Sequence, residues 1–180
     1  MSKPRALEFL IDKDHGMEKI IYAQYGSEIG SIFIASKKGR IIRLKIGGKG
    51  EEFLASVRQG LGAMPSMDKN AFHGVFKELD RYFKGRPVEF SAPVSLEGSA
   101  FQLKAWGRIK KIPWGRTMAY NAVADAAGSP NAARAAGAAC GANPVPIIIP
   151  CHRVIRSDGT IGGYTGGIWI KQALLRIEGL

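Results

Sequence analysis

The stretch that decides the fold runs from residue 119 to residue 155: AYNAVADAAGSPNAARAAGAACGANPVPIIIPCHRVI. Its first ten residues predict a short helix, which Gly128 closes because glycine readily takes the left-handed conformation that ends helices. Ser129 and Pro130 suit the N-cap and the first position of a second helix, predicted over 130–142. Two helices joined by a glycine-containing turn predict a helix-turn-helix, whose second helix commonly enters a DNA groove.

The second of these helices consists largely of alanine and glycine and offers one long polar side chain, Arg134. Reading a base sequence in the major groove requires several long polar side chains. Two interpretations therefore stay open. The helix packs tightly inside the protein, or its smooth surface approaches the DNA backbone and minor groove without sequence preference. In the second case Arg134 would fill the gap left by an extruded nucleotide.

A rigid apolar run, Pro144 to Ile149, ends abruptly in Pro150, Cys151, His152 and Arg153. Proline restricts the backbone just before the thiol. A cation next to a thiol lowers its pKa and raises the thiolate fraction, so the neighbours of Cys151 indicate a reactive cysteine. On the residues alone, a small buried hydrophobic cysteine remains the alternative. Cysteine hydrolases also pair Cys with His, but their histidine normally comes from far away in the sequence.

Downstream of the thiol, VIRSDGTIGGY at 154–164 predicts a β-hairpin with Asp158-Gly159 at its turn. A last helix is expected over 169–179, ending at Gly179. A helix-turn-helix followed by a hairpin is the pattern of a winged helix.

Upstream, residues 17–47 predict strands, with a hairpin turn at Lys38-Gly39. Apolar residues one helical turn apart then predict helices over 51–61 and 71–83. In the second helix they form the stripe Phe72, Phe76, Leu79 and Phe83. The segment 84–99 contains two prolines and two glycines, with a short strand-like VEF at 88–90, and is interpreted as a linker. We place a domain boundary near Gly98, which divides the chain into 1–97 and 98–180, and a further helix beyond it with the stripe Phe101, Ala105, Trp106 and Ile109.

The composition is that of a soluble globular protein of 180 residues, with 46% apolar and 23% charged residues. No run approaches the length of a membrane span, and the N-terminus lacks the features of a secretory signal, so we expect a cytoplasmic protein. The net charge of +11 favours an anionic partner such as nucleic acid, with a basic protein lacking such a partner as the alternative. The two cysteines, Cys140 and Cys151, show no zinc-binding spacing.

Several of these segments together resemble one family, the O6-alkylguanine-DNA alkyltransferases, also called methylated-DNA–protein-cysteine methyltransferases. IPCHRV, at 149–154, resembles the active-site signature of the family, and FQLKAWGRIKKIPWGRTMAY, at 101–120, resembles a second motif of the form FQ-x-x-V-W-x-x-L-x-x-I-P-x-G-x-T-x-x-Y. The segments 127–155 and 157–179 are similar to the recognition helix with its asparagine hinge and to the closing loop and helix. The resemblance runs from about Leu79 to Gly179.

The resemblance implies an α+β fold with two domains: a small N-terminal α/β domain with a ribonuclease-H-like sheet, and a C-terminal helical domain of winged-helix type. It implies DNA repair by irreversible, single-turnover transfer of the alkyl group of O6-alkylguanine, and less readily of O4-alkylthymine, to Cys151 after nucleotide flipping. The expected partner is double-stranded DNA containing O6-alkylguanine, and the expected state is a monomer. We expect no cofactor, and no zinc, because the N-terminal domain has no cysteine and only His15 and His73.

The resemblance also implies roles for individual residues. His152 would take the thiol proton through a water molecule, and Glu178 would orient that histidine. Tyr120 would face a ring nitrogen of the base, and Asn143 would stabilise the turn after the recognition helix. Residues of the recognition helix and the closing loop would meet the DNA: Ala133, Arg134, Gly137, Tyr164, Thr165 and Gly166. Arg153 has two open roles, a structural ion pair or a DNA contact.

Three rival functions make different predictions. A lesion-binding alkyltransferase-like protein carries another residue, often tryptophan, at the position of Cys151. A methylation-responsive transcription regulator needs an additional metal-thiolate domain. A cysteine hydrolase turns over repeatedly. Cys140, on the recognition helix, departs from the pattern we expect and places a second thiol near the first.

Overall fold

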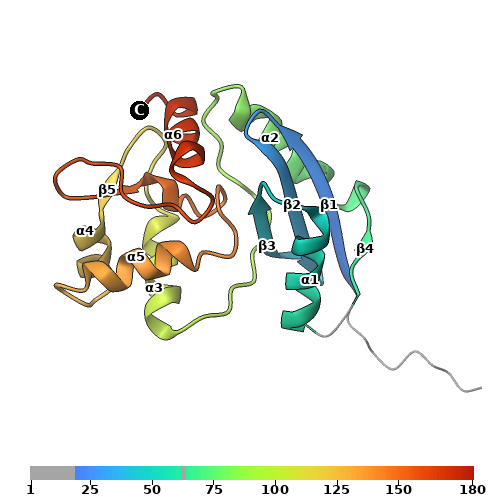
Figure 1. The fold of residues 1–180 in the computed structure, drawn as a ribbon, viewed down its shortest axis with the longest axis horizontal. Helices are drawn as coiled ribbons and strands as arrows, with labels where there is room; N and C mark the ends of the chain where they lie inside the picture. The colour runs from blue at the N-terminus through green and yellow to red at the C-terminus, as the bar shows by residue number, and fades with distance from the viewer. Residues whose placement is uncertain (1–18, 62–63) are drawn as a thin grey trace, which may run out of the picture.

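The computed structural model describes residues 19–61 and 64–180, with two halves that lie side by side (Figure 1). His15 lies outside the described residues. The first half is a sheet with two helices, and the second half consists mainly of helices, so the predicted mixed fold is confirmed. Its elements in the first half are β1 (Ile20–Ser27), β2 (Gly30–Lys37), β3 (Arg40–Ile46), α1 (Gly50–Leu61), β4 (Ser66–Met67), the 3-10 helix η1 (Asn70–Phe72) and α2 (His73–Phe83).

The sheet has the strand order β3-β2-β1-β4, in which β1, β2 and β3 are antiparallel and β4 runs parallel to β1. Lys38 and Gly39 connect β2 to β3 with φ angles of 51° and 71°. Two successive left-handed residues give the turn whose twist matches that of antiparallel strands. The predicted hairpin is confirmed.

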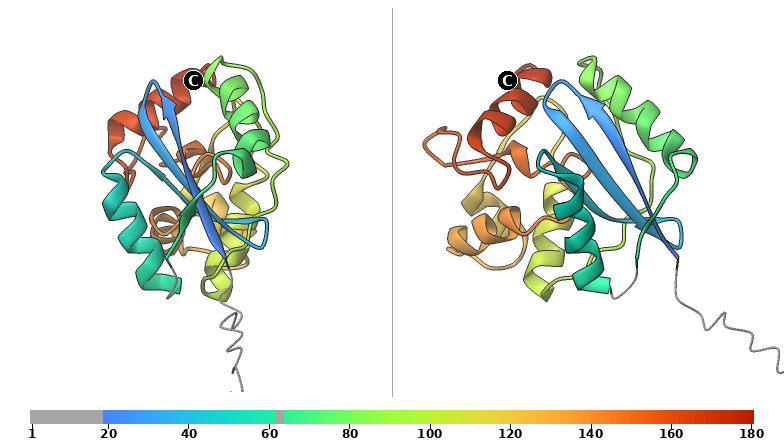
Figure 2. Two further views of the ribbon diagram at one scale, coloured as in Figure 1. Left: turned by 90° about the vertical axis from the view of Figure 1, so that its right-hand side faces the viewer. Right: turned by 45° about the vertical axis from the view of Figure 1, so that its right-hand side comes forward.

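The inner strand β2 is buried on both faces of the sheet. Its successive side chains point to opposite faces, and each face is covered by a hydrophobic core. Phe33 and Ala35 pack with Phe53 and Val57 of α1 on one face. Ile32 and its neighbours on the other face belong to the large core shared with α2 and the helical half. Figure 2 shows the sheet between α1 on one side and α2 with the helical half on the other.

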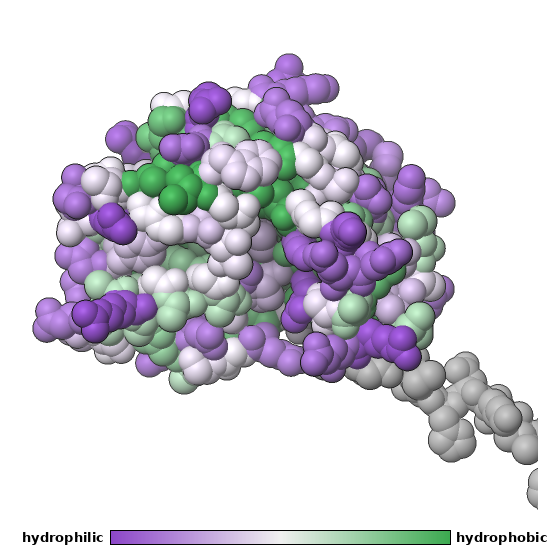
Figure 3. Space-filling model, viewed as in Figure 1, coloured by the Kyte–Doolittle hydropathy of each residue, from purple (hydrophilic) through white to green (hydrophobic). Residues whose placement is uncertain are grey.

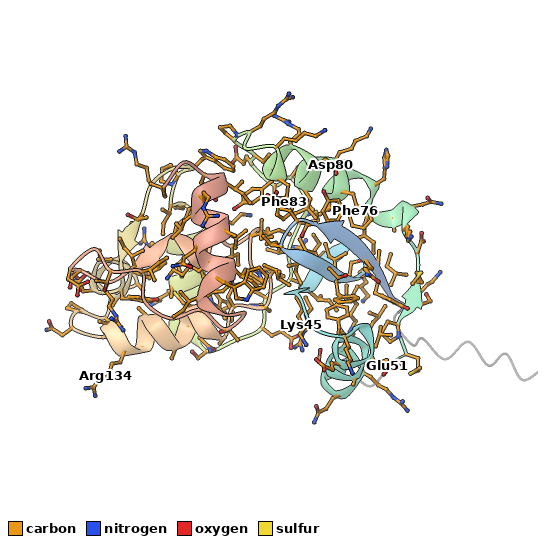
Figure 4. All side chains as sticks on the ribbon, turned by 45° about the horizontal axis from the view of Figure 1, so that its top comes forward. Lys45, Glu51, Phe76, Asp80, Phe83 and Arg134 are labelled. Carbon is orange, nitrogen blue, oxygen red and sulfur yellow. The ribbon has the colours of Figure 1, made fainter. Side chains whose placement is uncertain are left out.

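The face of α2 differs from the predicted stripe. Phe72 and Leu79 are buried as expected, but Tyr82 is also fully buried, whereas Phe76 and Phe83 are only partly buried. Phe76 and Phe83 lie between α2 and the sheet (Figure 4), where their rings pack against that of Tyr25 at centroid distances of 5.4 and 6.1 Å. The helix therefore contacts two neighbours, the sheet and the C-terminal half, and a single apolar stripe cannot describe both.

The segment 84–99 forms no regular strand, and VEF at 88–90 is not in a sheet. It runs along the edge strand β3, where Ile41 donates its N–H to the carbonyl of Pro93 and accepts from the N–H of Ser95. On the same strand Leu44 donates to the carbonyl of Pro144, at 2.8 Å. The edge of the sheet is thereby bonded both to the connecting segment and to the loop that leads to Cys151.

The second half contains α3 (Ala100–Ile109), β5 (Met118–Ala119), α4 (Tyr120–Ala126), α5 (Ala133–Gly141), the 3-10 helix η2 (Cys151–Arg153), β6 (Val154–Ile155) and α6 (Ile168–Ile177). Ser99 and Gln102 form a capping box that fixes the start of α3. The pair α4 and α5 is the predicted helix-turn-helix. However, Ser129 does not cap α5, which begins at Ala133 without a side-chain cap. The reason is Asn131, whose φ of 64° interrupts any helix started at Pro130.

The predicted β-hairpin at 154–164 is wrong. β6 pairs in parallel with β5 instead of with a following strand. A tight turn does form at Asp158-Gly159, where Arg156 donates its N–H to the carbonyl of Thr160 and Asp158 accepts from the N–H and hydroxyl of Thr160. After this turn the chain continues as a loop up to α6, so the wing of the winged helix is a loop.

The alanine-rich helix α5 packs inside the protein on one face, as the first interpretation expects, and exposes Arg134 on the other. Ala136 and Ala139 are buried against α3, and the indole N–H of Trp106 donates to the carbonyl of Ala139 at 2.8 Å. Arg134 lies on the exposed face and points away from the protein (Figure 4). Small side chains thus allow close helix packing on one face and a smooth surface on the other.

None of the helices within residues 19–61 and 64–180 has both the length and the apolar character that a membrane span requires. On the face shown in Figure 3, hydrophobic residues gather over α6, and hydrophilic residues cover α1 and much of the outline. Ile168 and Trp169, at the start of α6, are both more than half exposed, at 51% and 57%.

We predict that Trp106→Phe lowers the free energy of unfolding by about 1–3 kcal/mol, because the buried carbonyl of Ala139 loses its hydrogen-bond donor. Urea unfolding would measure this difference. The same change at the exposed Trp169 is the matched control, with an expected effect within about 0.5 kcal/mol. Equal effects at the two positions would contradict the assigned role of the Trp106 hydrogen bond.

Candidate active site

Asn143 holds the loop that presents the thiol. Its side-chain oxygen accepts from the N–H of Val145, and its amide nitrogen donates to the carbonyl of Ile149 at 2.7 Å and to the sulfur of Cys151 at 3.2 Å. Within this loop Ile147 has a φ of 71°, a conformation that is rare for a β-branched residue. The hydrogen bonds of the Asn143 side-chain amide and the burial of the Ile147 side chain hold the backbone in this unfavourable conformation.

Cys151 is only 3% exposed, yet it lines a cavity of about 390 Å³. The other residues of this cavity come from α4, α5 and the loop before α6: Tyr120, Ala133, Arg134, Gly137, Cys140, Gly141, Arg156, Gly162, Gly163, Tyr164 and Thr165. Burial raises the pKa of the Cys151 thiol, and the hydrogen bond from Asn143, the charge of Lys171 and the nearby Tyr164 hydroxyl only partly offset this effect. The resting cysteine is therefore a protonated thiol that needs a base.

The expectation that an adjacent cation activates the thiol is thus wrong for Arg153. Its guanidinium points to Glu178, with Nε 2.8 Å from Oε2 and Nη2 3.0 Å from Oε1, and it also donates to the carbonyl of Ile112. Of the two roles left open by the sequence, Arg153 takes the structural ion pair.

His152 and Glu178 form a fully buried pair, with His152 Nε2 2.7 Å from Glu178 Oε1. Burial alone would raise the pKa of the Glu178 carboxyl, but the hydrogen bonds and charges of His152 and Arg153 lower it to about 2. The carboxylate is ionised and can only accept, so Nε2 of His152 carries the hydrogen.

The imidazole of His152 is neutral at neutral pH, because burial lowers its pKa more than the charge of Glu178 raises it. With the hydrogen on Nε2, the lone pair lies on Nδ1. This atom is buried and has no hydrogen-bond partner among the described residues. A neutral imidazole with a free Nδ1 is a competent general base.

Lys171 is a buried lysine that the sequence analysis did not assign. Its ammonium donates to the carbonyl of Val154 at 2.6 Å and to the hydroxyl oxygen of Tyr120 at 3.4 Å. Burial lowers the pKa of Lys171, although the nearby Cys140 and Cys151 sulfurs act in the opposite direction. Since the Tyr120 oxygen accepts from Lys171, its own hydrogen is available to a molecule in the cavity.

The loop before α6 closes one side of the cavity. The Thr165 hydroxyl donates to the carbonyl of Gly141 at 3.1 Å and so ties the loop to α5. Gly162 has a φ of 69°, and a Cβ there would lie 3.0 Å from the Tyr120 hydroxyl, so glycine is required at this close approach. Gly166 lines an adjoining cavity of about 440 Å³, between β3 and the loop around Asn143, which also reaches Cys151.

Most of the residues predicted for the site lie together. Cys151 shares its cavity with Tyr120, Ala133, Arg134, Gly137, Tyr164 and Thr165, and Asn143 contacts its sulfur. His152 and Glu178 pair behind the cavity and do not line it. The sequence did not point to two further side chains at the site: Lys171, and Tyr82, whose hydroxyl donates to Glu178 Oε1 at 2.8 Å. Lys171 is a charge within the apolar pattern of α6, next to Ile170 and three residues before Leu174, and this was an available signal.

Among the described residues, no group of three or more His, Cys, Asp or Glu side chains is arranged to hold a metal ion. Cys140 and Cys151 are both free thiols.

Comparisons with known proteins show which family the chain resembles. A family model described as "6-O-methylguanine DNA methyltransferase, ribonuclease-like domain" matches residues 20–96, and one described as "6-O-methylguanine DNA methyltransferase, DNA binding domain" matches residues 100–180. A methylated-DNA–protein-cysteine methyltransferase of Saccharolobus islandicus is 37% identical over 161 residues, which are 89% of this chain and 97% of the relative.

A methylated-DNA–protein-cysteine methyltransferase of Mycobacterium tuberculosis is 47% identical over 111 residues, which are 62% of this chain and 67% of the relative. The crystal structure of Mycobacterium tuberculosis OGT in complex with DNA has a TM-score of 0.77 and 37% sequence identity, and the match covers 87% of this chain and 91% of that one.

We predict that Glu178→Gln lowers the free energy of unfolding at neutral pH by about 3–5 kcal/mol, because Arg153 remains buried without its counter-charge. The pKa of the folded carboxyl is about 2, below the value of about 4.3 in an unfolded chain. Its contribution is therefore complete above about pH 4.5 and is lost as the pH falls toward 2. Thermal unfolding of both proteins between pH 7 and pH 2 should show their difference shrinking across this window. Glu89→Gln, the same change at an exposed position, is the control. A difference between wild type and Glu178→Gln that stays constant with pH would contradict the prediction.

Proposed function

Because the chain belongs to the family of methylated-DNA–protein-cysteine methyltransferases, we propose that it repairs O6-alkylguanine in DNA. The alkyl group moves irreversibly to Cys151, once per protein molecule, and O4-alkylthymine reacts less readily. The observation that carries this proposal is the thiol of Cys151 in the cavity wall, bonded to Asn143, with Tyr120 lining the same cavity. These groups are the acceptor and the donor that the reaction needs.

The first requirement is removal of the thiol proton, since burial keeps Cys151 protonated. In the proposed reaction Nδ1 of His152 takes this proton through a bridging water molecule, and Glu178 stabilises the imidazolium that forms. The arrangement of nucleophile, base and orienting acid is that of other activated nucleophiles. The Asn143 amide and the Lys171 ammonium stabilise the thiolate.

The second requirement is a proton for the departing base. The sulfur attacks the alkyl carbon, the C–S bond forms, and the bond from that carbon to O6 breaks, with its electron pair moving into the guanine ring. The Tyr120 hydroxyl donates its hydrogen to a ring nitrogen, and the nearby Lys171 ammonium stabilises the tyrosine oxygen. Return of the proton from the His152 imidazolium, through water, to the Tyr120 oxygen restores both groups. The net change is then exchange of the thiol hydrogen for the alkyl group, and the repaired guanine carries its ordinary ring hydrogen.

The third requirement is access, because the O6 substituent of a stacked guanine cannot reach a recessed thiol. We propose that the nucleotide is flipped into the cavity, at a cost of a few kcal/mol that DNA contacts offset. Ala133 and Gly137 on the exposed face of α5 allow the minor groove to approach, and Arg134 fills the vacated position. The Thr165 backbone N–H would meet the oxygen of the base.

We also propose that residues 98–180 carry DNA binding and transfer, with the division from 1–97 near Gly98, and that the protein acts as a monomer. The division is supported by the 390 Å³ cavity at Cys151, whose lining residues all fall within 120–165.

Intact-protein mass spectrometry after mixing with an O6-methylguanine oligonucleotide tests the transfer. The wild-type protein should gain one methylene unit stoichiometrically, and Cys151→Ala should gain nothing. Cys140→Ala is the matched control, because this second thiol lines the same cavity and its variant should still be methylated. Repeated turnover, or a mass gain that follows Cys140 and not Cys151, would exclude the proposal.

Arg134→Ala should lower the transfer rate on double-stranded DNA by about tenfold, because the extruded nucleotide is no longer replaced in the stack. On the free base O6-methylguanine the variant should equal the wild type. Binding of both proteins should weaken with salt, because phosphate contacts release counterions. Arg81→Ala, on exposed α2, is the control with unchanged rates. The same loss on the free base would show that Arg134 has no role in flipping.

A further inference from the structure

The hydroxyl of Tyr82 reaches the catalytic pair from the other half of the protein. Tyr82 lies on α2, is fully buried, and donates to Glu178 Oε1 at 2.8 Å. Its oxygen is also 3.3 Å from His152 Nε2. Within residues 19–61 and 64–180, the other side chains that bond to the Glu178 carboxylate are His152 and Arg153 of the C-terminal half, and Tyr82 is the group that comes from the sheet half.

The protonation of Tyr82 is settled by its surroundings. Burial and the charge of Glu178 raise the pKa of its hydroxyl far above the usual range. The group therefore keeps its single hydrogen, and the ionised Glu178 takes it. The lone pairs of the tyrosine oxygen remain, and one can accept from Nε2–H of His152. Both neighbours of Nε2 are thus acceptors, and a hydrogen is favoured on that nitrogen.

We propose that Tyr82 is a positioning residue for the transfer reaction, which holds Glu178 and keeps the hydrogen of His152 on Nε2 so that Nδ1 remains the base. This inference rests on the proposed function, and it deepens that function by adding a group from the N-terminal half to the proton path. Tyr82 does not touch the substrate; it acts through Glu178 and His152.

The ring of Tyr82 is held separately from its hydroxyl. It packs edge-on against Trp114 at a centroid distance of 5.2 Å and against Phe83 at 5.4 Å, and it lies 6.2 Å from Phe90. Phenylalanine would keep these contacts. Tyr82→Phe therefore removes one oxygen atom and leaves the packing of α2 in place.

The charged and titratable groups that act on His152 come from three elements: Tyr82 of α2, Arg153 of η2, and Lys171 and Glu178 of α6 and its end. Arg153 and Lys171 disfavour a proton on the imidazole, and Glu178 favours it. The hydrogen bond from Tyr82 partly neutralises the charge on Glu178 Oε1, the oxygen that also bonds to His152. Its removal should let Glu178 hold the imidazolium more tightly, and the protonation of His152 should move to higher pH.

The test is the single-turnover rate of methyl transfer as a function of pH, for wild type, Tyr82→Phe and Tyr25→Phe. Tyr82→Phe should lower the rate about tenfold at neutral pH and move the acidic limb of the profile to higher pH. Tyr25→Phe is the matched control, since its hydroxyl donates to Asp80 Oδ1 at 2.7 Å away from the site. It should leave both rate and profile unchanged. A loss of rate with an unmoved limb would overturn the inference.

A second arm repeats the change in a His152→Gln background. If Tyr82 acts through His152, the tenfold loss should shrink to less than about twofold, because coupled residues are non-additive. An undiminished loss would show a merely structural role. Failure of wild type to accept methyl at all would instead refute the proposed function.

A third measurement requires no variant. Nitrogen NMR of the wild-type protein, which has three histidines, reports which ring nitrogen of His152 carries the hydrogen. Nε2 should appear protonated and Nδ1 unprotonated at neutral pH, and Tyr82→Phe should weaken this preference. The opposite tautomer in wild type would overturn the inference, whether or not the variant folds.

Discussion

The buried carboxylate of Glu178 is the interaction on which the rest of the site depends. A buried charge without partners would destabilise the fold by several kcal/mol. Here the carboxylate is met by Nε2–H of His152, two N–H groups of Arg153 and the hydroxyl of Tyr82. These donors come from η2 and α2, while Glu178 follows α6. One charge therefore joins the end of the chain, the catalytic turn and the sheet half, and it also determines which nitrogen of His152 is basic.

Burial keeps the thiol of Cys151 protonated, and a thiol is less reactive than a thiolate. A thiolate in permanent contact with solvent would be open to oxidation. In this structure burial raises the pKa of Cys151, and the strained loop of Asn143 and Ile147 keeps its sulfur in the cavity wall. The cation beside it in the sequence, Arg153, is fully engaged by Glu178. The proposed chemistry therefore requires that a base deprotonates the buried thiol during the reaction, because the resting cysteine is not a thiolate.

The helix α5 packs against α3 on one face and lines the cavity at Cys151 on another. Its inner face must pack against α3, where Trp106 bonds to Ala139, and its outer face must remain smooth at the cavity. Alanine and glycine meet both demands, since they fill little space on either side. The single long side chain, Arg134, then stands out on the exposed face, where the proposed flipping mechanism requires it.

The sequence by itself predicted most of the helices and the strands of the first half, and its resemblance to the family implied the roles proposed for the residues of the reactive turn. Turn residues predicted the hairpin at Lys38-Gly39, and Gly128 with Ser129-Pro130 predicted the helix-turn-helix, although Ser129 does not cap α5. The motif around Cys151, together with the segments 101–120, 127–155 and 157–179, carried the resemblance to the family. Local signals failed where tertiary contacts decide the structure. β6 pairs with β5 and not with the segment that follows it in sequence. Tyr82, which lies outside the predicted stripe of α2, is buried, and its hydroxyl reaches Glu178, 96 residues away. Such pairings depend on which surfaces meet after the two halves pack, and spacing along the chain carries no information about a partner in another element.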